Sequence, residues 1–289
     1  MDGVRLVGIV DTKPGRAADI ASKLGVPSFG HLHELPIEGL DAATIAVPTV
    51  SHLDVALPLI DAGVSVLVEK PLSSSLDDAD RMIEAAARRG VVLAAGHTER
   101  FNPAVVAALP LVSNPRFIEV HRLGTFPERS LDIDVIFDLM IHDLDLLLAA
   151  VGADVESVEA VGVNVLTPRT DIANARLRFA DGCIANVTAS RISRERVRKA
   201  RFFQRQSYVS IDFAAQEVEV YRLAPRQGRP AIEGGRLDIV SEEPLKRELE
   251  DFVDAVRSRR APTVTGAAGR EALALATRVA EAMIVTEEI

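Results

Sequence analysis

Residues 66–71 read Val-Leu-Val-Glu-Lys-Pro, an apolar run that ends abruptly on a glutamate, a lysine and a proline. Such a run is typical of a strand that is buried on both faces of a parallel sheet. A strand of this kind would deliver Lys70 to the carboxyl edge of the sheet, which is where open α/β folds bind their ligands. The simpler interpretation is an ordinary strand end with solvated charges. The neighbouring sequence distinguishes the two.

Strand and helix patterns alternate on both sides of this run. Three further apolar runs have the length of buried strands: Val4–Val10, Ala43–Val47 and Val91–Ala95. The helix after residues 66–71 can begin with Ser75 as its N-terminal cap, because a serine side chain accepts a hydrogen bond from a free backbone amide of the first turn. Unbroken alternation of strands and helices predicts a doubly wound, parallel, Rossmann-like sheet. We assign this sheet to residues 1–102.

The chain has 289 residues, enough for two domains with a substantial core. Its formal net charge of −9 argues against nucleic acid as a partner, because nucleic-acid binders concentrate Lys and Arg on one face. The single cysteine, Cys183, excludes an internal disulfide and a multi-cysteine metal site, so we predict no metal. We find no apolar segment that could span a bilayer and no basic-then-apolar leader, which predicts a cytoplasmic protein with no membrane partner.

The pattern changes after residue 116, where strands follow one another without regular helical crossovers. Asp181-Gly182 is a tight-turn signal between two alternating runs. The basic residues between 191 and 205 alternate with apolar ones, as in a strand with one charged face. We therefore predict an α+β substrate-binding and oligomerisation domain over residues 103–289, with a large, open, mostly antiparallel sheet. The uncovered face of such a sheet would suit a subunit interface.

One long helix, residues 134–150, precedes this series of strands. Asp138 and His142 are four residues apart in it, so a helix would place them on one face, about 6 Å apart along the axis. A carboxylate beside an imidazole can select its tautomer and raise its basicity, and a histidine suits proton transfer near neutral pH. The alternative is a polar stripe on a half-buried helix.

Asp11 ends the first strand, at the position where Rossmann folds bind a ribose hydroxyl of a dinucleotide. An acidic residue there favours NAD over NADP because it repels a 2′-phosphate, but Lys13 and Arg16 weaken that preference and leave NADP open. The alternative for Asp11 is a turn residue or a helix cap. The Gly-x-Gly-x-x-Gly loop expected about twenty residues before this acidic residue is absent, since only ten residues precede Asp11.

Three motifs together resemble the Gfo/Idh/MocA family, the NAD(P)-dependent sugar dehydrogenases that include glucose-fructose oxidoreductase and inositol dehydrogenase. They are Glu69-Lys70-Pro71 at its strand end, Pro48-Thr49 with His52, and the pair Asp138 and His142. Their order and spacing cover almost the whole chain. Within the family, residues 96–103, Gly-His-Thr-Glu-Arg-Phe-Asn-Pro, and the basic strand after Ser190 resemble the branch that oxidises the 3-hydroxyl of UDP-N-acetylglucosamine or its uronic acid.

The resemblance implies a role for each matching residue. Lys70 would hold the substrate hydroxyl and stabilise its developing charge, and His142 would take the hydroxyl proton while hydride passes to nicotinamide. Asp138 would orient this site or bind the sugar. The resemblance also implies cofactor contacts from Asp11, Pro48, Thr49, His52 and Glu69, and substrate contacts from Arg100 and Asn102.

Family members begin with a strand, a Gly-rich turn and a helix, and all three are missing before Asp11. The chain therefore resembles a shortened copy of a larger enzyme, through a misplaced start codon or a genuine truncation, and we expect it to bind NAD poorly. Two alternatives to a nucleotide-sugar dehydrogenase stay open: a non-catalytic sugar-nucleotide-binding protein, and an aldose or inositol dehydrogenase of the same family. By resemblance, we expect a homodimer or homotetramer that forms through the open sheet.

Overall fold

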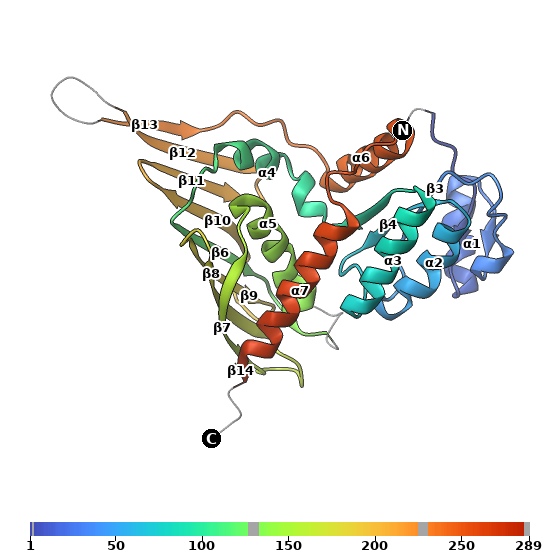
Figure 1. The fold of residues 1–289 in the computed structure, drawn as a ribbon, viewed down its shortest axis with the longest axis horizontal. Coiled ribbons are helices and arrows are strands. Elements are labelled where there is room, and N and C mark those ends of the chain that lie inside the picture. Colours follow the sequence, from blue (N-terminus) through green and yellow to red (C-terminus); the bar gives the residue numbers. More distant parts are fainter. Residues whose placement is uncertain (2, 127–132, 225–230, 286–289) are drawn as a thin grey trace.

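The structure is a computed structural model and describes residues 1, 3–126, 133–224 and 231–285 (Figure 1). Its first elements are β1 (Ile9–Val10), α1 (Pro14–Leu24), β2 (Ser28–Phe29), β3 (Ala42–Ile45), α2 (His52–Asp61), β4 (Ser65–Glu69), α3 (Leu76–Arg89) and β5 (Leu93–Gly96). They are followed by α4 (Pro103–Ala108), β6 (Phe117–Leu123), α5 (Ile141–Val151), β7 (Val155–Val163), β8 (Ile172–Phe179), β9 (Ile184–Ser190), β10 (Val197–Gln204), β11 (Ser207–Asp212), β12 (Glu217–Ala224), β13 (Ala231–Arg236), α6 (Pro244–Ser258), α7 (Gly266–Ala282) and β14 (Met283–Val285). A 3-10 turn, Thr98–Phe101, follows β5, and a π-helical turn, Ile136–Met140, precedes α5.

β4 is the middle strand of a parallel sheet with the order β3-β4-β5. Val66 and Val68 point to one face and pack in the core formed with α2 and α3. Leu67 points to the other face and packs against Phe252 of α6. Because both faces are covered, these three strand residues are at most 6% exposed, which is the burial that a continuous apolar strand predicts. The parallel, Rossmann-like sheet is confirmed.

β1 and β2 form a second, separate parallel pair. The sequence predicted a strand over Val4–Val10, but only Ile9–Val10 pairs with a neighbour, and Val4 and Leu6 are 44% and 49% exposed. The ladder holds two residue pairs, Ile9 with Ser28 and Val10 with Phe29. β1 and β3 thus belong to different sheets. The predicted missing N-terminal unit stays a prediction.

α3 shows how local sequence sets the ends of a helix beside the site. The hydroxyl of Ser75 accepts a hydrogen bond from the amide of Asp78 at 3.1 Å, as predicted for an N-terminal cap. The helix ends at Gly90, whose φ of 67° lies in the left-handed region that glycine adopts without strain.

Nine strands of the described part of the chain form the large sheet, in the order β13-β12-β11-β10-β6-β9-β8-β7-β14. The pairs β6–β9 and β7–β14 are parallel and the others are antiparallel, so the predicted large, mostly antiparallel sheet is confirmed. Alternate residues such as Ala175, Leu177 and Phe179 of β8 are fully buried. They face the core beneath α4, α5 and α7, which lie on one side of the sheet in Figure 1.

The C-terminal helix α7 joins the three-stranded sheet to the large sheet. α7 runs toward β14 of the large sheet (Figure 1). Near its start it packs against β5, where a side chain at Gly269 would bring its Cβ to 2.5 Å from the Cβ of Ala95. The glycine therefore permits the close approach of α7 to β5. We call residues 1–102 the first unit and residues 103–289 the second unit. α7 contacts both units, and the division at residue 102 stays a prediction. Among the described residues, no helix is both long and apolar enough to cross a membrane, and the cytoplasmic location stays a prediction.

Candidate active site

Lys70 follows directly after β4 and reaches across to the second unit. Its Nζ donates a hydrogen bond to the carbonyl oxygen of Asp138 at 2.6 Å and lies 3.3 Å from the Oδ1 atom of the same residue. The side chains of Lys70 and Asp138 are 19% and 25% exposed, so the ion pair is shielded but still accessible. The peptide bond between Lys70 and Pro71 is cis. The structure thus brings together two predicted catalytic residues that are 68 positions apart.

Asp138 does not lie in a regular α-helix, although the sequence predicted one over residues 134–150. It belongs to the π-helical turn Ile136–Met140, and the regular helix α5 begins only at Ile141. Single π turns occur frequently at functional sites. Here the turn offers both the backbone oxygen and the carboxylate of Asp138 to the Lys70 ammonium.

His142 is half-buried in the first turn of α5. Its Nδ1 atom is buried and has no hydrogen-bond partner in the described part of the chain. Burial, together with the charges of Arg122 and Lys70, lowers the pKa of His142 well below its usual value. The imidazole is therefore neutral near pH 7 and able to accept a proton. The described residues show no hydrogen bond between His142 and Asp138, so the predicted control of the tautomer by that carboxylate is not seen.

A second histidine lies behind the first. His97 is fully buried, and its ring stands edge-on to the ring of His142 with 6.1 Å between the centroids. Its Nδ1 atom lies 4.0 Å from Oδ2 of Asp145, whose Oδ1 accepts a 3.3 Å hydrogen bond from Arg100. Burial lowers the pKa of His97 and raises the pKa of Asp145, which disfavours charge on both. Arg100, predicted to face the substrate, contacts Asp145 with its side chain 15% exposed.

The helix that carries His142 is tied to the large sheet by a buried ion pair. Arg122 of β6 donates to both oxygens of Asp143, at 2.9 Å from Nε and 2.7 Å from Nη2, and its Nη2 also lies 3.3 Å from Glu99. Two parallel charge-assisted bonds fix orientation as well as distance. Four residues of this cluster are not predicted from the sequence: Arg122, Asp143, His97 and Asp145. For His97 the available signal was its place directly after β5, at the same sheet edge as Lys70.

Asn102, predicted to contact the substrate, has a structural use. It is 2% exposed, its Oδ1 accepts a hydrogen bond from the amide of Ala104, and its Nδ2 donates to the carbonyl oxygen of Phe213. The side chain therefore caps α4 and joins it to the end of β11. Both polar atoms are engaged within the protein, which is why the structure does not bring Asn102 to a ligand surface.

A cleft of about 520 Å³ opens between the two units. Its walls include Pro48, Thr49, Lys70, Phe137, Asp138 and Arg169. Apolar surface beside a few polar groups suits a flat, partly polar ring such as nicotinamide, so these residues fit the implied cofactor. In the described residues, no three His, Cys, Asp or Glu side chains are grouped so that they could hold a metal ion.

His52 lies behind the wall of this cleft rather than in it. The side chain is 1% exposed, with Nε2 3.0 Å from the carbonyl oxygen of Val47 and Nδ1 3.1 and 3.2 Å from those of Pro71 and Leu72. Both ring nitrogens thus face backbone carbonyl oxygens, and the predicted contact of His52 with the cofactor stays a prediction. His52 joins the two backbone segments that carry Pro48 and Lys70, and so positions the cleft wall.

The two acidic residues predicted at the cofactor lie at strand ends. Asp11 follows β1, accepts a hydrogen bond from the amide of Lys13 at 2.8 Å and lies 3.5 Å from Arg16. Glu69 ends β4 half-buried, and its Oε2 accepts a 3.2 Å hydrogen bond from the amide of Lys70. Each lies at the carboxyl end of a strand of its own parallel sheet, the end at which such sheets bind ligands, and their roles stay predictions.

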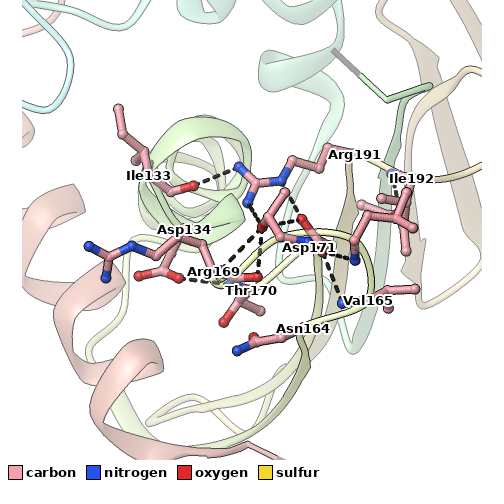
Figure 2. Close-up of polar contacts among 12 residues, drawn as sticks. Ile133, Asp134, Asn164, Val165, Arg169, Thr170, Asp171, Arg191 and Ile192 are labelled. Atoms are coloured by element: carbon pink, nitrogen blue, oxygen red, sulfur yellow. Dashed lines mark hydrogen bonds and ion pairs between the residues drawn. The ribbon is translucent and has the colours of Figure 1, made fainter. Parts of the chain in front are cut away.

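The loop between β7 and β8 is held by one buried carboxylate (Figure 2). Asp171 accepts hydrogen bonds from the amides of residues 165, 166 and 167, from the Thr167 hydroxyl and, at 2.8 Å, from Nε of Arg191. Arg191 also donates to the carbonyl oxygen of Ile133 at 2.6 Å, which ties the loop to the chain entering the π-helical turn. The loop thus presents Arg169 to the cleft from a well-anchored base.

Comparisons with known proteins agree with this geometry. The family model described as "Oxidoreductase family, NAD-binding Rossmann fold" matches residues 1–97, and the "GFO/IDH/MocA C-terminal domain" matches residues 116–208. UDP-N-acetylglucosamine 3-dehydrogenase of Acidithiobacillus ferrooxidans is 39% identical over 278 residues, which cover 95% of this chain and 88% of that protein. A solved structure of that enzyme matches with a TM-score of 0.90 at 38% identity, over 96% of this chain and 89% of the other.

More distant relatives include scyllo-inositol 2-dehydrogenase (NAD(+)) of Bacillus subtilis, 26% identical over 91% of this chain and 82% of that protein. The resemblance predicted from the motifs at Lys70, Pro48 and Asp138 is confirmed. The chain belongs to the Gfo/Idh/MocA oxidoreductase family, which combines an NAD-binding Rossmann fold with the GFO/IDH/MocA C-terminal domain.

Proposed function

We propose that this chain oxidises the 3-hydroxyl of a UDP-N-acetylglucosamine-type nucleotide sugar, with NAD as hydride acceptor. The observation that carries the proposal is the contact of Lys70 with Asp138 in the wall of a cleft. His142 follows one turn later in the chain, and the charge of Lys70 is among the causes that lower its pKa. The name of the Acidithiobacillus ferrooxidans relative supports the choice of substrate. The inositol dehydrogenase relatives keep a free cyclitol or aldose as the second candidate.

The proposed chemistry divides between three side chains. Lys70 holds the reacting hydroxyl and stabilises negative charge on its oxygen, while Asp138 fixes the direction of the ammonium. His142 accepts the hydroxyl proton, because its lowered pKa keeps the ring neutral near pH 7. A bound nicotinamide supplies the hydride acceptor. Partial burial of the three groups strengthens their electrostatic contacts by excluding water.

NAD rather than NADP is proposed because of Asp11. Its carboxylate lies at the end of β1, where it could accept hydrogen bonds from a ribose and would repel a 2′-phosphate. The side chain of Arg16 that contacts it is 66% exposed, so this surface ion pair offsets the repulsion only weakly.

The test is the Lys70→Ala variant in an assay of NADH absorbance at 340 nm, with UDP-N-acetylglucosamine and NAD as substrates. We expect kcat to fall by about 10²–10³-fold, the usual loss on removing one group that stabilises an oxyanion. Lys246→Ala changes a lysine that is exposed on α6, and it serves as the matched control. Full activity of Lys70→Ala would refute the assignment, and sugar-nucleotide binding by an unaltered chain that binds no NAD would favour the non-catalytic alternative.

We also propose that two copies associate through the open face of the large sheet. Four aromatic rings cross that face from β6 to β12, with successive centroids 5.7, 5.2 and 6.3 Å apart: Phe117, Phe203, Tyr208 and Tyr221. Tyr221 is 38% exposed, and aromatic residues are enriched in protein interfaces. Tyr221→Asp should shift the protein from dimer or tetramer to monomer in analytical ultracentrifugation, whereas Val240→Asp, exposed outside the sheet, should not. A monomeric parent protein would contradict this arrangement.

A further inference from the structure

Arg198 stands on the inner face of the large sheet. Along β10, Ala200 and Phe202 share its face, and both are buried in the core beneath the helices. Arg201 points to the opposite face, where it lies 3.8 Å from Glu119. Arg198 itself is exposed, although it occupies the face that is otherwise core. Its guanidinium therefore reaches solvent on the side of the sheet that carries the catalytic helix.

The neighbour of Arg198 across the strands is another arginine. In the antiparallel pair β6–β10, Arg198 is directly opposite Arg122. Like charges in this arrangement destabilise a sheet. Arg122 is neutralised by Asp143 and Glu99, but the described residues include no carboxylate within ion-pair distance of Arg198. Arg198 is thus placed beside a second cation and makes no ion pair of its own in the described part of the chain, and the carboxylate that its charge acts on, Asp143, is already bound to Arg122.

Arg198 also lies within electrostatic reach of the proposed base. Burial is the main cause of the lowered pKa of His142, followed by the charges of Arg122, Lys70, His97 and Arg198. The geometry agrees, because Arg198 is directly opposite Arg122, and Arg122 binds Asp143, the residue that follows His142 in α5. The guanidinium of Arg198 therefore lies on the face of the sheet to which the start of α5 is tied.

We propose that Arg198 determines substrate specificity by binding an anionic group of the substrate, a diphosphate or a sugar carboxylate, while the reacting hydroxyl lies between Lys70 and His142. This inference rests on the proposed function and deepens it. A guanidinium presents two parallel donors that match phosphate or carboxylate oxygens. An incoming anion would also give Arg198 the ion-pair partner that it lacks among the described residues, whereas Arg122 already has Asp143 and Glu99.

The experiment compares Arg198→Met with Arg201→Met, a matched change on the other face of the same strand. Isothermal titration calorimetry measures the affinity of the full chain for four probes: UDP-N-acetylglucosamine, glucuronic acid, N-acetylglucosamine and NAD. We expect Arg198→Met to lower the affinity of the protein for one of the two anionic probes by about 10- to 100-fold, the usual effect of losing a charge-assisted contact. Whichever of the first two probes loses affinity identifies phosphate or carboxylate as the recognised group. N-acetylglucosamine and NAD should bind both variants equally well, and Arg198→Lys should restore part of the affinity.

Four results would overturn the inference: no loss with Arg198→Met, equal loss for charged and neutral sugars, loss confined to NAD, or the same loss with Arg201→Met. If the parent chain binds a charged sugar through Arg198 but forms no NADH, the inference stands and the proposed function fails. If the parent chain oxidises only neutral sugars and binds neither anionic probe, the inference fails and the dehydrogenase chemistry stands.

Discussion

Replacing Glu248 by glutamine should stabilise the folded protein above pH 7 and change it little at pH 5. Glu248 is 2% exposed on α6, below the turn that follows His97. Its Oε2 accepts a 3.0 Å hydrogen bond from the Thr98 hydroxyl, while Oε1 is buried without a partner in the described part of the chain. Burial, with smaller contributions from the charges of Glu69 and Asp251, raises its pKa from 4.5 to about 7.

The sign and size of the effect follow from these two pKa values. Between about pH 4.5 and 7 the folded state holds the Glu248 proton and the unfolded state does not, so the free energy of unfolding falls as pH rises through this window. The folded and unfolded pKa values of Glu248 differ by about 2.5. At 1.36 kcal/mol per pKa unit, this difference corresponds to about 3 kcal/mol in the free energy of unfolding. Glutamine cannot ionise and still accepts the Thr98 hydrogen bond, so the variant should avoid this loss.

Thermal unfolding at pH 5 and pH 8 measures the prediction. At pH 8 we expect Glu248→Gln to raise Tm by about 5–10 °C, the shift that corresponds to about 3 kcal/mol in a chain of this size. Glu250→Gln alters an exposed carboxylate of the same helix and should shift Tm little at either pH. An equal effect of Glu248→Gln at both pH values would refute the reasoning, because the benefit must come from a proton that only the carboxyl group can lose.

Three further substitutions test separate contacts. Asp171→Asn should lower the free energy of unfolding by about 3–5 kcal/mol, because Arg191 would stay buried without its carboxylate; urea unfolding measures this, and a loss below about 1 kcal/mol would contradict it. His142→Asn should lower kcat by about 10²–10⁴-fold. In the unsubstituted protein, kcat should stay constant from pH 8 to below 6.5, because the lowered pKa of His142 keeps its ring neutral. A fall in kcat near pH 6.5 on the acid side of the pH–rate profile would argue against His142 as the base. Asn102→Ala should reduce stability by about 1–2 kcal/mol through loss of the α4 cap with an unchanged KM for the sugar nucleotide, while a tenfold rise in KM would restore its predicted substrate contact.

Features encoded over a few consecutive residues were predictable. The apolar run before Lys70 predicts a buried strand because both faces of that strand need apolar side chains, and the run ends where the sheet edge begins. Ser75 caps its helix through its own hydroxyl, and Asp181-Gly182 forms the predicted hairpin between β8 and β9. Each of these features depends on residues that are only a few positions apart in the sequence.

The sequence by itself therefore determined the alternation of strands and helices, the position of Lys70 at a strand end and the family. Only the tertiary structure decided which distant side chains meet. It paired Lys70 with Asp138, tied Arg122 to Asp143 and enclosed His52 behind the cleft wall. The physical reason is that these contacts join elements far apart in the chain, so their partners depend on how the sheets and helices pack. The sequence around a polar residue does not show whether its side chain will contact a ligand or hydrogen-bond to the protein backbone in the folded structure.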